Sequence, residues 1–124
     1  MSAPSALIYV ADDDSGILEL IVTVLCRGGF EAIGFTSAEA LMAALLRRPP
    51  AAVMLDVRMP GQGGLDALKA LKENPTLAKV PVLMLTGDGR LDRIVQAMQL
   101  GAIGYVMKPF DNAQLVERVR GLFV

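Results

Sequence analysis

The sequence lacks several residue types on which common protein chemistry depends. Among its 124 residues there is no histidine and no tryptophan, one cysteine, and only 5% aromatic residues. Without histidine the chain cannot supply an imidazole base, a histidine-ligated metal site or a phosphohistidine. The single Cys26 excludes an internal disulfide and every zinc site that needs several cysteines. Chemistry at a site in this chain must therefore rely mainly on carboxylates, hydroxyls and ammonium groups.

An excess of charge of one sign and long apolar runs are also missing. The chain has 12 Lys and Arg against 13 Asp and Glu, which gives a formal net charge of −1. This balance lacks the basic footprint of a nucleic-acid-binding domain. No apolar run approaches the ~18 residues of a membrane span, and residues 1–4 do not resemble a signal peptide. We therefore expect a cytoplasmic protein that binds neither nucleic acid directly nor a membrane.

What the chain does contain is a regular alternation of two apolar patterns. Its length and its 53% hydrophobic content predict one folded domain over residues 1–124. Short apolar runs at 7–11, 32–35, 52–55, 80–85 and 103–107 are typical of strands. Helical spacing follows each run, at about 15–27, 38–48, 65–71, 91–100 and 112–122. The pattern predicts an α/β fold, with a five-stranded, doubly wound parallel sheet covered by helices on both faces.

Polar side chains follow four of the expected strands at the points where they end. These are Asp12-Asp13-Asp14, Asp56, Thr86 and Lys108. In open α/β sheets, ligands bind just beyond the carboxyl ends of the strands. Three acids replace the glycine-rich loop that cradles phosphate in nucleotide-binding folds, so phosphate needs a cation between itself and them. Such oxygen ligands favour Mg²⁺ or Mn²⁺, with Ca²⁺ less suitable. With Lys108 and Thr86 nearby, the set suits a phosphoryl group on Asp56.

Each of these residues also has a simpler interpretation. Acids suit the N-terminus of any helix, and Asp14 is expected to be a helix cap instead of a ligand. Thr86 alone could be an ordinary turn residue, and Lys108 alone a solvated one. Cys26 is expected to pack among apolar residues, as are most of the methionines, while the glycine-rich residues 61–64 are expected to form a loop. The alignment of acids and lysine at one sheet edge favours the metal site.

The chain resembles, over essentially its whole length, the receiver domain of bacterial two-component response regulators, with the chemotaxis regulators as the nearest type. The matching positions are Asp12-Asp13, residues 55–61 (Leu-Asp-Val-Arg-Met-Pro-Gly), Thr86-Gly87, Tyr105 and Lys108-Pro109-Phe110. Each motif is weak alone, and their order at the correct strand ends is specific. The resemblance implies a flavodoxin-like (βα)₅ fold with strand order 2-1-3-4-5.

The resemblance also implies a role for each acid. Asp56 would be the phosphoacceptor. Asp13, Asp56 and the backbone carbonyl of Arg58 would bind Mg²⁺, for which Mn²⁺ can substitute, while Asp12 would act through a bound water. The pairing of Arg58 with Asp88 across the pocket mouth is a further hypothesis, which would slow the loss of the phosphoryl group.

The remaining motif positions have implied roles in sensing the phosphoryl group. Lys108 would pair with the phosphoryl oxygens, and its bond to Pro109 is expected to be cis. Thr86 would move towards the phosphoryl group, and Tyr105 would turn inward into the space that Thr86 leaves. This pair would link Asp56 to a face formed by the last two helices and the fifth strand.

The implied function is that of a signalling receiver, not an enzyme with an external substrate. It would take a phosphoryl group from a sensor histidine kinase or a histidine phosphotransfer protein, and catalyse only its own phosphorylation and dephosphorylation. Its output would be a downstream protein, a C-terminal effector domain outside this chain, or a homodimer formed on phosphorylation. Two alternatives stay open: a receiver that acts only as an interaction module, and a Mg²⁺-dependent phosphohydrolase of the same architecture.

Overall fold

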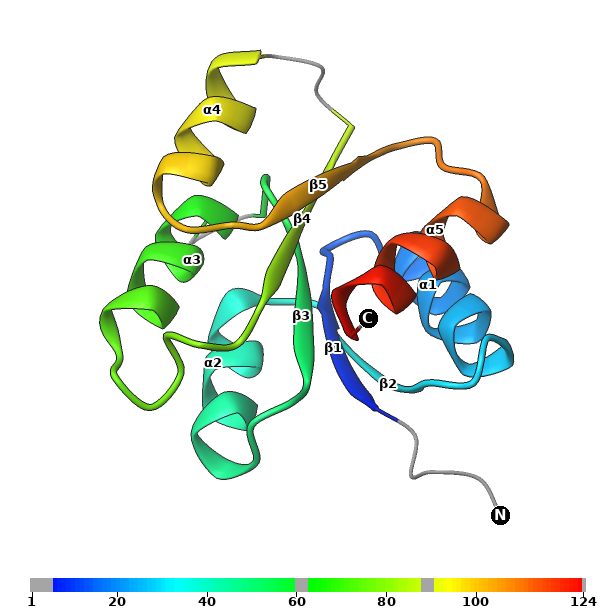
Figure 1. The fold of residues 1–124 in the computed structure, drawn as a ribbon, viewed down its shortest axis with the longest axis horizontal. Coiled ribbons are helices and arrows are strands. Elements are labelled where there is room, and N and C mark those ends of the chain that lie inside the picture. The colour runs from blue at the N-terminus through cyan, green and yellow to red at the C-terminus, as the bar shows by residue number, and fades with distance from the viewer. Residues whose placement is uncertain (1–5, 60–62, 88–90, 124) are drawn as a thin grey trace.

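Five parallel strands form the centre of the molecule. The structure, a computed structural model, describes residues 6–59, 63–87 and 91–123. The strands are β1 (Leu7–Ala11), β2 (Glu31–Phe35), β3 (Ala52–Asp56), β4 (Val82–Thr86) and β5 (Gly104–Met107). All neighbouring pairs are parallel, and the order across the sheet is β2-β1-β3-β4-β5 (Figure 1). The predicted fold class and strand order are confirmed.

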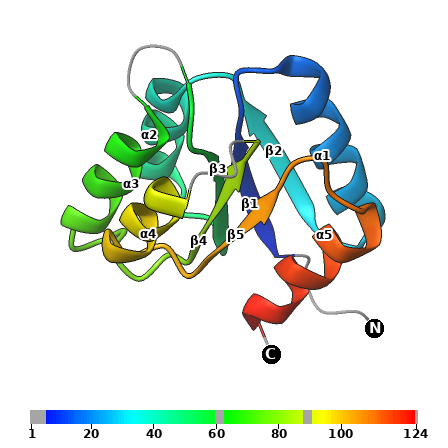
Figure 2. The same ribbon diagram turned by 90° about the horizontal axis from the view of Figure 1, so that it is seen from above.

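Helices cover both faces of this sheet. They are α1 (Ser15–Arg27), α2 (Ala38–Arg47), α3 (Gly64–Glu73), α4 (Leu91–Gln99) and α5 (Asn112–Arg120), followed by the 3₁₀ turn η1 (Gly121–Phe123). Helices α1 and α5 lie on one face, and α2, α3 and α4 lie on the other (Figure 2). No described helix has both the length and the apolar character that crossing a bilayer requires.

The core has two parts, one on each side of the sheet. Strands β1, β3 and β4 are buried along their whole lengths, which explains why their sequences are continuously apolar. On one side they pack against buried residues of α1 and α5, such as Ile21 and Leu115. On the other side they pack against α2 and α3, including Leu41 and Leu68. Strands β2 and β5 lie at the edges of the sheet and are partly exposed.

Side-chain caps begin three of the helices. The Asp14 carboxylate accepts hydrogen bonds from the backbone N–H groups of Gly16 and Ile17, at 3.0 and 3.1 Å. Ser37 and Asp111 cap α2 and α5 in the same way. The prediction that Asp14 is a cap is confirmed.

The prediction that Cys26 packs among apolar residues is wrong, and the prediction for the methionines fails at two positions. Cys26 is exposed, because it follows the buried Leu25 and falls on the outer side of α1. Met98 and Met107 are also exposed, since Met98 follows the one buried residue of α4 and Met107 lies on edge strand β5. Met54 and Met84 are fully buried, as expected.

Strand β4 begins at Val82, two residues later than predicted, because the N–H of Val80 bonds back to Leu77 in the preceding turn.

Candidate metal and phosphoryl site

The carboxyl ends of the strands surround one open cavity of about 810 Å³. The register pairs Ala11 with Leu55, so Asp12 and Asp56 follow side by side on adjacent strands. On the other side of β3, the ends of β4 and β5 also face the site. There the Lys108 N–H donates to the Thr86 carbonyl at 2.7 Å. The topology therefore brings together residues that lie far apart in the sequence, as the strand-end argument predicted.

Three carboxylates form a compact cluster in this cavity. One oxygen from each of Asp12, Asp13 and Asp56 lies within 4.8 Å of the others. Asp12 and Asp56 are buried, with 0% and 5% relative exposure, and Asp13 is exposed. Octahedral Mg²⁺ binds oxygens at about 2.0–2.1 Å, so its ligand atoms lie roughly 3–4 Å apart. Modest side-chain adjustment would bring these oxygens to that spacing, so the residues present fit a divalent cation.

Lys108 provides the balancing positive charge. Its Nζ lies 2.6 Å from Oδ2 of Asp12 and 3.2 Å from Oδ2 of Asp56. Burial alone would lower the pKa of Lys108, but the contacts with the two carboxylates outweigh it and raise that pKa. The ammonium group is therefore charged whenever the site is used. The peptide bond between Lys108 and Pro109 is cis, as expected.

The pKa of the Asp56 carboxyl is raised well above its usual range. Burial is the largest cause, and with the charge of Asp12 it raises the pKa of Asp56 to about 6 from 3.8. The backbone N–H of Arg58, 3.2 Å from Oδ1, and Lys108 act in the opposite direction. Asp56 is mostly ionised at neutral pH, and burial makes this charge unfavourable even with Lys108 beside it.

Helix α3 begins directly against the backbone of Asp56. The N–H of Gly64 donates to the carbonyl of Val57 at 3.1 Å. A Cβ at Gly64 would overlap the carbonyl oxygen of Asp56, so only glycine can occupy this position without moving the strand end. The sequence predicts a loop at residues 61–64, and no pattern in it indicates this contact. Residues 61 and 62 lie outside the described residues.

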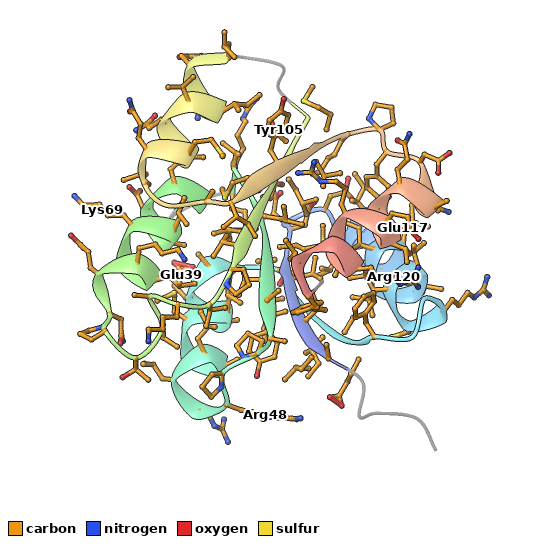
Figure 3. The ribbon with its side chains drawn as sticks, viewed as in Figure 1. Glu39, Arg48, Lys69, Tyr105, Glu117 and Arg120 are labelled. Atoms are coloured by element: carbon orange, nitrogen blue, oxygen red, sulfur yellow. The ribbon has the colours of Figure 1, made fainter. Side chains whose placement is uncertain are left out.

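Thr86 and Tyr105 lie on the same side of the sheet. Thr86 is buried at the end of β4, opposite Met107, and Tyr105 lies opposite Met84. Register partners in parallel strands point to the same face. Tyr105 is 41% exposed and lies on the side of the molecule covered by α4 (Figure 3). In this conformation its ring is directed outward.

Two arginines also line the cavity. The exposed Arg58 follows β3, as expected, but its partner in the pairing hypothesis, Asp88, lies outside the described residues. Arg93, on α4, was not predicted. Its spacing within an amphipathic helix does not distinguish it from a solvated arginine, so the sequence contains no signal for it.

The comparisons with known proteins agree with this geometry. The sequence profile of the response regulator receiver domain matches residues 8–120. The phosphate regulon transcriptional regulatory protein PhoB of Pseudomonas aeruginosa is 30% identical over 115 residues, which cover 93% of this chain and 50% of PhoB. The transcriptional regulatory protein FixJ of Azorhizobium caulinodans is 37% identical over 113 residues, covering 91% of this chain and 53% of FixJ. This chain thus spans about half the length of these relatives.

Solved structures show the same fold. The receiver domain of NtrX from Brucella abortus has a TM-score of 0.86 and 30% sequence identity, with 92% of this chain and 95% of that chain covered. The chemotaxis response regulator CheY4 of Vibrio cholerae has a TM-score of 0.89, and covers 95% of this chain and 98% of its own. Its identity is 23%, so that likeness concerns the fold alone.

Proposed function

Because this chain belongs to the response regulator receiver domain family, we propose that Asp56 accepts a phosphoryl group from the phosphohistidine of a sensor histidine kinase or a histidine phosphotransfer protein. In this step a carboxylate oxygen of Asp56 bonds to phosphorus, the P–N bond breaks, and the imidazole leaves with a proton. The observation that carries the proposal is the buried Asp56 carboxylate held between two further acids and Lys108.

Mg²⁺ is the cation that this donor set suits best, and Mn²⁺ can substitute. Asp13, Asp56 and the backbone carbonyl of Arg58 would bind it. Both Asp12 oxygens are already engaged, Oδ1 by the Asp14 N–H at 3.0 Å and Oδ2 by Lys108. This engagement supports a contact of Asp12 with the metal through water. The bound ion would neutralise charge on the transferring oxygens.

Three residues would then stabilise the phosphorylated state. Lys108 is placed to exchange its contact with the Asp56 carboxylate for one with a phosphoryl oxygen. Thr86, buried at the adjacent strand end, would donate its hydroxyl to another oxygen. Tyr105, now directed outward, would turn into the space that Thr86 leaves.

The output face would be formed by α4, β5 and α5. Exposed apolar side chains gather on α4, on β5 and on the residue directly before β5, namely Val95, Met98, Ile103, Tyr105 and Met107, each more than 40% exposed. Such a group supports a protein-binding surface. Its partner would be a downstream protein, an effector domain outside this chain, or a second copy after phosphorylation. We propose that residues 1–124 act as one receiver domain in the cytoplasm, without binding nucleic acid or membranes directly.

Intact mass spectrometry after incubation with acetyl phosphate tests this function. Wild-type protein should gain one phosphoryl mass in Mg²⁺, and lose that gain with EDTA. Asp56→Asn should gain none, while Glu39→Gln, an exposed change on α2, should behave as wild type (Figure 3).

Two other outcomes would contradict the proposal. If folded wild type forms no adduct with acetyl phosphate or with phosphorylated histidine proteins, the chain is an interaction module only. Catalytic turnover of unrelated phosphate esters would instead indicate a phosphohydrolase, in which phosphoaspartate is an intermediate.

A further inference from the structure

Arg93 connects the phosphoacceptor cavity to helix α4. It is a half-buried residue in the first turn of α4, and its Nε atom is shielded from solvent. Its side chain lines the same cavity as Asp56 and Lys108. The other cationic side chains that line this cavity, Arg58 and Lys108, lie just after strands. Among the described residues, Arg93 is the cation that comes from a helix.

A second cavity, of about 340 Å³, adjoins the first between α3 and α4. Three residues line both cavities: Val57, Gly63 and Arg93. The second cavity is acidic, because Asp66 of α3 and Asp92 of α4 line it. Oδ2 of Asp66 lies 4.0 Å from the point where a Cβ on Gly63 would stand, so this carboxylate faces the shared wall. Arg93 therefore lines two cavities that each contain a group of carboxylates.

Phosphorylation would change the balance between these two groups. A phosphoryl group carries about −1.5 to −2 charge and three acceptor oxygens, in place of a single carboxylate charge. Lys108 also has to balance Asp12, from which it is separated by 2.6 Å. A guanidinium can bind two phosphoryl oxygens at once, which an ammonium group does less well.

We propose that Arg93 binds the phosphoryl group on Asp56 and thereby transmits phosphorylation to α4. The inference rests on the proposed function of Asp56. Arg93 has an interaction partner in this structure, so the phosphoryl group must compete for the guanidinium. Only Ala97 of α4 is buried, so a pull on Arg93 meets little resistance from the core.

Binding of beryllofluoride with Mg²⁺, a stable mimic of an aspartyl phosphoryl group, tests this proposal by calorimetry. Arg93→Gln should weaken binding about 10-fold, the size expected for one lost charge-assisted interaction. Arg93→Lys should recover part of that loss. Arg47→Gln, on the exposed end of α2, is the matched control and should bind as wild type.

Hydrogen exchange of residues 91–99 provides the second measurement. In wild type the mimic should change the protection of α4, and in Arg93→Gln that change should be lost even at saturating mimic. Wild-type affinity and an unchanged α4 response in folded Arg93→Gln would overturn the inference. Failure of the wild type to bind the mimic or form an adduct would overturn the proposed function instead, so the two failures are distinguishable.

Discussion

Helices α3 and α4 both reach the candidate site around Asp56, yet they are held to the molecule very differently. Four residues of α3 are buried, Gly64, Ala67, Leu68 and Leu71, against one of α4, Ala97. The first residue of α3 touches the backbone of Asp56, whereas α4 reaches the cavity through a long side chain, Arg93. The site therefore has one wall set by backbone packing and another that can move at low cost. A change of charge at Asp56 should be transmitted through the second.

Gly64→Ala should have the largest effect, because it attacks the packed wall. The added Cβ meets a backbone carbonyl, which cannot move aside without shifting the end of β3. We expect a loss of more than ~3 kcal/mol in the free energy of unfolding, and little or no phosphoryl adduct in the protein that remains folded.

Gly121→Ala is the matched control for this change. Nothing lies within 4 Å of its added Cβ, and its φ of −61° suits any residue. Thermal melts and intact mass should show this variant to be at least as stable as wild type and fully phosphorylated. If Gly64→Ala has the same melting temperature as the control, then α3 does not pack against Asp56 as described.

The next effect concerns the charge that the packed wall keeps buried. The pKa of Asp56 is raised to about 6 from 3.8, so the folded state holds this proton more tightly than the unfolded chain. The bound proton therefore stabilises the folded state. This stabilisation is complete below pH 3.8 and is lost as the pH rises through about 6. The difference in stability between Asp56→Asn and wild type should therefore become more positive by ~1–3 kcal/mol between pH 4 and pH 7.5.

Thermal melts in EDTA would measure this difference, with Glu39→Gln, which removes an exposed acid instead, as the comparison. Mg²⁺ should reduce the difference at pH 7.5, because a cation compensates the Asp56 charge. A pH-independent difference would show that burial does not penalise this carboxylate.

Lys72 tests how the far end of α3 is held. Its Nζ donates to the carbonyls of Ala78 and Val80, at 3.0 and 2.8 Å, and burial lowers its pKa. Lys72→Met keeps the aliphatic stem but leaves both carbonyls without this donor, so we expect a loss of ~1–2 kcal/mol by denaturant unfolding. Lys69→Met, on the exposed side of the same helix (Figure 3), should change stability by less than ~0.5 kcal/mol. Equal effects of the two changes would contradict the contact.

Sequence patterns predicted the sheet and the strand-end chemistry because both depend on local features. Buried central strands must be continuously apolar, and polar residues at their ends are then conspicuous, as Asp56 is after residues 52–55. The close approach of Gly64 to Asp56 depends on the path of a backbone through space, which no spacing encodes. The position of Arg93 in the cavity and the exposure of Cys26 were not predicted for a related reason. On a helix with few buried positions, sequence alone does not show which way a side chain of the outer surface points.

The smallest effect on stability is expected at α4, and this is where the two helices contrast most sharply. Met98 is 44% exposed, so Met98→Ala should change the free energy of unfolding by no more than ~0.5 kcal/mol, whereas Leu68→Ala on α3, at 0% exposure, should cost ~2–5 kcal/mol. If α4 and β5 form the output face, Met98→Ala should nevertheless weaken phosphorylation-dependent binding or self-association, measured by ultracentrifugation with beryllofluoride. A site on a weakly packed helix can respond to a distant charge because so little of the core has to be disrupted when the helix moves. If Met98→Ala associates as wild type does, both with and without beryllofluoride, the output lies on another face. The difference in packing between α3 and α4 would then have no functional consequence at α4.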